Sequence, residues 1–154
     1  MVRLFRMLFS SLLPLFLVSG AFAATFALPA PSIWKLNPAA STSGDHSAPS
    51  PDNTISVNSY SAGSMNITVH YVGADHKPMD VTFNGPADGR PHRYSGGMGS
   101  FRDDGVYTFE QPDGTREYGT MTLSPDGKTL TNTYTVRPRV GASMQVVSVY
   151  SRVK

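Results

Sequence analysis

Residues 104–136 read DGVYTFEQPDGTREYGTMTLSPDGKTLTNTYTV, and this stretch decides the fold. Short runs in which apolar and polar residues alternate are separated by Asp-Gly pairs. Asp tolerates, and Gly freely adopts, the backbone angles that a tight reversal between antiparallel strands requires. The stretch therefore predicts a succession of antiparallel hairpins. With two earlier pairs of the same kind, the predicted turns are Asn84-Gly85, Asp88-Gly89, Asp104-Gly105, Asp113-Gly114 and Asp126-Gly127.

The alternation extends over most of the chain after residue 53. In residues 65–71 the apolar side chains occupy every second position, and in residues 129–136 threonines alternate with Leu, Asn, Tyr and Val. Residues 32–36 and 143–153 supply a first and a last strand. About eight to ten short strands in succession leave two exposed edges unless the sheet closes on itself. We therefore expect an all-β fold, a single antiparallel up-and-down β-barrel.

An outer-membrane barrel is the rival architecture. Its outward face would have to be apolar, whereas threonines occupy one whole face of residues 129–135. The chain also ends in Lys154 rather than in an aromatic residue. We expect no insertion into a membrane once the signal peptide described below is removed.

The first 23 residues have the pattern of a secretion signal peptide. Arg3 and Arg6 give a positively charged start, and residues 8–18 form an apolar stretch that is too short to span a bilayer. Small residues then precede Ala24, where we predict cleavage. This pattern predicts export to a bacterial periplasm or secretion from the cell.

Charge and composition exclude several classes of function. The chain has 13 Lys and Arg residues against 11 Asp and Glu, and loss of Arg3 and Arg6 with the signal leaves 11 against 11. A neutral mature chain without a basic block is not typical of a nucleic-acid-binding protein. The absence of cysteine excludes disulfides, a thiolate nucleophile and zinc–cysteine sites.

The mature chain is long enough for one domain. We predict that residues 24–31 form a tether and that residues 32–154 form the barrel domain. Residues 37–52 are rich in Ser, Ala and Pro, so we expect a flexible excursion there.

Four segments resemble a family of small exported bacterial proteins that have a lipocalin-like (calycin-like) β-barrel domain. The resemblance implies that Trp34 closes one end of the barrel and that Arg152 packs across it as a structural barrel-end pair. Two features differ from that family: Ser32 stands where Gly is usual, and no helix follows the last strand. The segments are SIWKLNP at 32–38, ADHKP at 74–78, LSPDGKTLT at 123–131 and VVSVYSR at 146–152.

The sequence gives no pattern typical of a metal, haem or catalytic site. The histidines are scattered, none follows His92, and no closely spaced Met repeat occurs, so we predict no metal and no cofactor. The glycine-rich residues 95–100 lack the Lys-Ser/Thr pair of a phosphate loop, and we expect a flexible loop at the barrel rim. Glu110 and Glu117 flank a predicted turn and are expected in solvent, so we predict no catalysis there.

The leading functional hypothesis is a non-enzymatic, exported lipocalin-like protein that binds a small, mainly apolar ligand inside the barrel. Asn132 shares the predicted inward face, where its amide either makes a structural hydrogen bond or contacts the ligand. The alternative is a protein-interaction module, an inhibitor or envelope factor, that acts through the loop at 84–99. The candidate ligand-binding residues are Tyr71, Phe83, Tyr107, Phe109, Asn132 and Tyr134.

Overall fold

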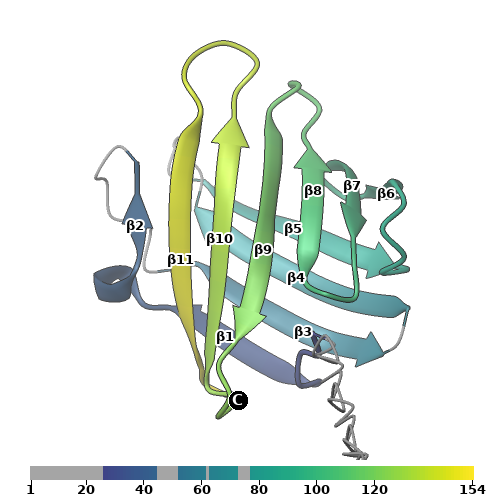
Figure 1. Ribbon diagram of the computed structural model, residues 1–154, viewed down its shortest axis with the longest axis vertical. Helices are drawn as coiled ribbons and strands as arrows, with labels where there is room; N and C mark the ends of the chain where they lie inside the picture. The colour runs from purple at the N-terminus through teal and green to yellow at the C-terminus, as the bar shows by residue number, and fades with distance from the viewer. Residues whose placement is uncertain (1–25, 45–51, 62, 73–76) are drawn as a thin grey trace, which may run out of the picture.

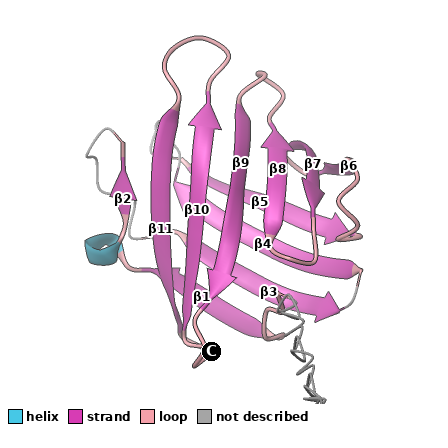
Figure 2. Cartoon of the chain, in the orientation of Figure 1, coloured by secondary structure: helices cyan, strands magenta, loops and turns pink. Residues whose placement is uncertain are grey.

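The computed structural model describes residues 26–44, 52–61, 63–72 and 77–154 (Figure 1). Regular structure in these residues is almost entirely β-strand, with one 3-10 turn, η1 (Pro38–Ala40) (Figure 2). The predicted all-β class is therefore confirmed. The strands are β1 (Ser32–Leu36), β2 (Thr42–Ser43), β3 (Thr54–Ser61), β4 (Ser64–Val72), β5 (Pro78–Gly85), β6 (His92–Tyr94), β7 (Gly97–Phe101), β8 (Val106–Glu110), β9 (Arg116–Leu123), β10 (Thr129–Arg137) and β11 (Met144–Arg152).

These strands form one antiparallel sheet that curls into a nearly closed barrel. The sheet order is β5-β4-β3-β1-β11-β10-β9-β8-β7-β6, with β2 added beside β11. From β3 to β5 and from β6 to β11, strands that follow one another in the chain are neighbours in the sheet, and β1 pairs with both β3 and the last strand, β11. In Figure 1, β8 to β11 form the front wall, while β1 and β3 to β5 cross behind them. The predicted up-and-down barrel is confirmed.

The two ends of the sheet, β5 and β6, meet at a short seam. The amide of Ser95, just after β6, donates to the carbonyl of Thr82 in β5 at 3.4 Å. The amide of Thr82 in turn donates to Ser95 Oγ at 2.7 Å. These two bonds satisfy backbone groups that would otherwise be exposed at the sheet edges, so they close the ring.

Four of the five predicted turns are present, and one is wrong. The glycines at 89, 105, 114 and 127 have φ angles of 76°, 82°, 84° and 67°. In each turn the Asp carboxylate accepts a bond from the backbone N–H two residues later, at 2.8 to 3.2 Å. Asn84-Gly85 instead lies inside β5, where Gly85 pairs with Met65. Sheet pairing along the whole of β4 prevails over the local turn preference there.

Residues 95 and 96 form a tight turn and residues 97–100 lie in β7, so the prediction of a flexible loop over 95–100 is wrong for most of that stretch. The predicted short strand at 92–94 is present as β6, and β7 follows after a tight turn. A Cβ on Gly97 would lie 2.0 Å from the carbonyl oxygen of Glu110, and one on Gly99 would lie 2.6 Å from that of Thr108. Glycine is required because the backbone of β8 approaches this closely.

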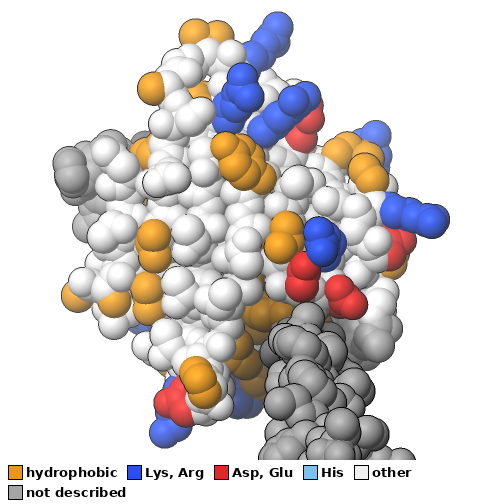
Figure 3. All heavy atoms as spheres, in the orientation of Figure 1, with side chains coloured by type: hydrophobic (Ala, Val, Ile, Leu, Met, Phe, Trp, Pro, Cys, Tyr) orange, Lys and Arg blue, Asp and Glu red, His pale blue; other side chains and the backbone are white. Residues whose placement is uncertain are grey.

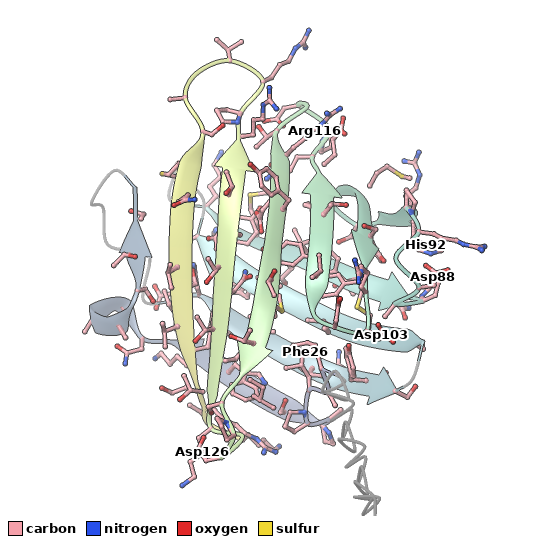
Figure 4. All side chains as sticks on the ribbon, viewed as in Figure 1. Phe26, Asp88, His92, Asp103, Arg116 and Asp126 are labelled. Atoms are coloured by element: carbon pink, nitrogen blue, oxygen red, sulfur yellow. The ribbon has the colours of Figure 1, made fainter. Side chains whose placement is uncertain are left out.

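The segment before β1 contributes to the core. Phe26 and Leu28, within the predicted tether at 24–31, are buried. The Phe26 amide donates to the carbonyl of Asp103 at 3.0 Å, and its ring meets the Tyr60 ring edge to face at 6.0 Å. Figure 4 shows Phe26 and Asp103 near the lower end of the barrel, which this segment covers. The predicted signal peptide, residues 1–23, lies outside the described residues.

Residues 37–44, the first half of the predicted excursion, lie against β11. Ser41 Oγ donates to the carbonyl of Asn37 at 2.8 Å and accepts from the amide of Val149 at 2.9 Å. The β2 strand then pairs with Val146 and Val147. These bonds give this polar segment a defined path along the barrel wall. Residues 45–51 lie outside the described residues.

Trp34, on β1, is fully buried. It lies directly opposite Arg152 in the β1–β11 register. Its indole Nε1 donates to Ser32 Oγ at 2.8 Å, and that hydroxyl donates to the carbonyl of Pro29. The Arg152 guanidinium is exposed and donates to the carbonyl of Lys154 at 3.1 Å. Ser32, which differs from the resembling family, thus supplies the acceptor that a buried indole requires.

We expect Ser32→Ala to lower the free energy of unfolding by about 1–3 kcal/mol, because it leaves a buried indole N–H without an acceptor. Urea denaturation measures the change. Ser151→Ala, at an exposed position of β11, is the matched control and should change stability little. Equal stability of Ser32→Ala and the parent protein would contradict this role for the hydroxyl.

Candidate functional site

A cavity of about 220 Å³ lies inside the barrel between the front and back walls. Gln111, just after β8, and Val136, near the end of β10, line its upper side in the view of Figure 1. Its lining includes every residue that the sequence predicts for ligand binding. These residues are Tyr71 on β4, Phe83 on β5, Tyr107 and Phe109 on β8, and Asn132 and Tyr134 on β10.

Alternation along each strand brings these six side chains together. On β10, Leu130 and Asn132 are buried while Thr133 is exposed, as a strand with one inward face requires. On β8, Tyr107 and Phe109 are buried for the same reason. Figure 3 shows that the outer surface over β9 to β11 carries mainly polar side chains, with isolated hydrophobic groups.

Aromatic side chains fill the barrel interior around the cavity. The Phe83 ring lies 5.3 Å from Phe109 and 5.7 Å from Phe101 between centroids, both edge to face. Phe101 stacks on Tyr107 at 5.2 Å with an angle of 11° between the rings. Such ring pairs stabilise the core by about 0.5–1.5 kcal/mol beyond their burial. The resulting wall is rigid and apolar.

One polar network crosses this apolar interior. Asn132 Nδ2 donates to Tyr107 Oη at 3.0 Å, and Tyr107 Oη donates to Glu117 Oε1 at 2.5 Å. Asn132 is only 7% exposed, yet its Oδ1 has no hydrogen-bond partner. A buried acceptor without a partner costs about 1–3 kcal/mol. Of the two interpretations of Asn132, the structural bond is present, and its buried Oδ1 is left without a partner.

Glu117 lines the cavity, which contradicts the prediction that it lies in solvent. Glu110, by contrast, is exposed and pairs with Arg116 at 2.9 Å. Glu117 lies an even number of residues from Met121 and Leu123 on β9, and all three side chains are at least partly buried. This spacing could have identified Glu117 from the sequence, because a carboxylate on the same face of a strand as apolar residues is expected to point inward.

Burial raises the pKa of Glu117, and the hydrogen bond from Tyr107 offsets part of that rise. Burial also raises the pKa of Tyr107 well above its ordinary value, and the Glu117 charge adds to it. Two further tyrosines, Tyr134 and Tyr150, share a buried serine, Ser148, as hydrogen-bond partner. Among the described residues that line the cavity, Glu117 is the only one with a charged side chain.

Other features of the described residues point to no second chemistry. No group of three His, Asp or Glu side chains in those residues is placed to hold a metal ion. None of the helices described is long and apolar enough to cross a bilayer. About half of the segment at 84–99, on which the interaction-module alternative depends, is β-strand, and that alternative stays a prediction.

No family model matches the chain, and no curated protein matches it significantly. The fold and the cavity therefore carry the functional argument.

We expect Glu117→Gln to become more stable relative to the parent protein as pH rises. A folded-state pKa above the unfolded value means that the folded protein binds the proton more tightly, so the parent protein loses stability from about pH 4.5, the ordinary value, up through the raised pKa. Glutamine keeps the shape and still accepts from Tyr107. Urea unfolding of both proteins across this pH range measures the difference.

The control for this comparison is Glu110→Gln, which removes an exposed carboxylate at the other end of the same turn. Its stability relative to the parent should not show the rise expected for Glu117→Gln. Parallel stability curves for the parent protein and Glu117→Gln would show that Glu117 is not desolvated.

Proposed function

We propose that this protein binds a small, mainly apolar ligand in the barrel interior and catalyses no reaction. The observation that carries the proposal is the cavity of about 220 Å³ whose lining unites all six candidate residues. Ligand sites are typically concave and apolar with a few convergent polar groups. This cavity has that composition: aromatic walls with one network of Asn132, Tyr107 and Glu117.

The size of the cavity limits the ligand. A protein cavity of about 150 Å³ accommodates benzene. A volume of about 220 Å³ therefore suits a single substituted ring or a short branched chain. Binding would gain about 25 cal/mol for each Å² of apolar surface removed from water. Asn132 and the tyrosine hydroxyls would then fix the orientation of the ligand.

We propose further that the protein is an exported, lipocalin-like protein of a bacterial periplasm or extracellular space. The signal pattern in residues 1–23 and the cysteine-free, formally neutral mature chain support export. The barrel architecture supports the lipocalin-like comparison. The predicted cleavage before Ala24 also leaves Phe26 and Leu28, the first buried side chains described, with the mature chain.

We expect native mass spectrometry of the protein, purified gently from its own host, to show an additional non-covalent mass. Val136→Trp should abolish it by filling the cavity near its upper side. The control is Thr133→Trp, at an exposed position of the same strand, which should retain the mass. A protein that carries no ligand and does not bind n-propylbenzene in a thermal-shift titration would contradict the proposal.

We expect the mature protein recovered from the periplasm or medium to begin at Ala24, as measured by intact mass. Ala23→Asp should block cleavage, because the peptidase requires a small residue there, and leave the longer chain with the membrane fraction. Full-length protein in the cytoplasm of the parent strain would contradict export.

A further inference from the structure

The cavity combines one carboxylate with aromatic walls, and none of the described residues that line it is basic. Glu117 has no ion-pair partner among the described residues, and its Oε1 accepts only from Tyr107. Glu117 is partly buried, and partial removal of a carboxylate from water without a counter-charge is costly unless something else compensates it. A positively charged group beside Glu117 would therefore be stabilised in this cavity.

The groups of the network that have no hydrogen-bond partner are acceptors. Tyr107 has a single proton, which it donates to Glu117, so its oxygen must accept from the Asn132 amide nitrogen. This order fixes the amide orientation and leaves Asn132 Oδ1 unpartnered. No described donor bonds Glu117 Oε2. A ligand that enters the cavity therefore meets the Glu117 carboxylate as an acceptor.

Aromatic faces around the cavity favour the same kind of ligand. The lining includes the rings of Phe83, Phe101 and Phe109 and of four tyrosines. The face of an aromatic ring is negative, and attraction between such a face and a cation is worth about 2 kcal/mol or more when both groups are desolvated. Aromatic walls that surround a carboxylate therefore suit a cation with an apolar body better than a purely hydrocarbon ligand.

We propose that the ligand is a small organic cation, an ammonium group on an apolar body, bound with its charge on Glu117 and its body against Phe83 and Phe109. This inference rests on the proposed function, because it names the chemical class that the cavity takes. An anion would instead meet the Glu117 charge in a site without basic side chains.

Exposed arginines at the upper end do not reverse this preference. Arg116 and Arg137 lie directly opposite each other on β9 and β10, and Arg116 is paired with Glu110. Figure 3 shows Lys and Arg side chains at that end, in contact with solvent. Exposed charges are screened within about 8–10 Å at physiological salt, whereas Glu117 acts at contact distance inside the cavity.

The proposed binding depends on whether Glu117 is protonated. The titratable groups that surround Glu117 from the other strands are tyrosines: Tyr71 on β4, Tyr107 on β8, Tyr134 on β10 and Tyr150 on β11. All of them stay neutral where Glu117 ionises. Because a cation favours the ionised carboxylate, affinity should increase as pH rises through the Glu117 transition and level off above it.

Three probes that have equal numbers of non-hydrogen atoms test the inference: phenethylamine, 2-phenylethanol and n-propylbenzene. Isothermal titration with the mature protein should give at least about tenfold tighter binding of phenethylamine than of 2-phenylethanol. Glu117→Gln should remove this preference while it retains binding of n-propylbenzene, which shows that the cavity is intact. Glu110→Gln should behave like the parent protein, and phenylacetate should bind least.

The outcomes separate this inference from the proposed function. Binding of n-propylbenzene or 2-phenylethanol as tight as that of phenethylamine would overturn the cation inference and leave the apolar-ligand proposal standing. Preferential binding of phenylacetate would overturn it in favour of an anion. Failure of every probe to bind the parent protein, with no ligand carried from the host, would overturn both.

Discussion

The whole architecture depends on β1, a short strand that pairs on both sides. Trp34 lies opposite Ile55 of β3 on one side and opposite Arg152 of β11 on the other. This double pairing joins the beginning of the domain to its end, at the entropic cost of closing a very long loop. Burial of the indole and of the neighbouring Leu36 offsets part of that cost. Without this junction the sheet would stay open, and no interior would exist.

Closure also determines what the interior contains. Inward positions come from every strand at once, so a small barrel is filled by its own side chains unless their sizes leave space. Here Phe83, Phe101 and Tyr107 pack on one another and leave a cavity beside them. Phe26 lies near the lower end, and Trp34 on β1 is fully buried. The space that remains lies beside the network of Glu117 and Asn132.

Much of this could be predicted from the sequence, because period-2 alternation and Asp-Gly turns are local signals. They identify the strands and place Asn132 beside Tyr134 on an inward face. What they missed depends on contacts between distant segments. In the sequence, Gly97 and Gly99 suggest a flexible loop. In the structure they are required because the backbone of β8 approaches them closely. The position of Glu117 close to a turn predicts that it lies in solvent. Its spacing of four residues from Met121 on the same strand instead places both side chains on the inward face.

The charge of Glu117 is the feature that folding alone does not explain. The barrel satisfies two other buried tyrosines with Ser148, a neutral group, so an acceptor for Tyr107 does not have to be ionisable. A neutral side chain of similar shape in a buried site is often as stabilising as a charged one, or more so. The carboxylate therefore carries a cost that its structural bond does not require. A bound partner of opposite charge would remove that cost.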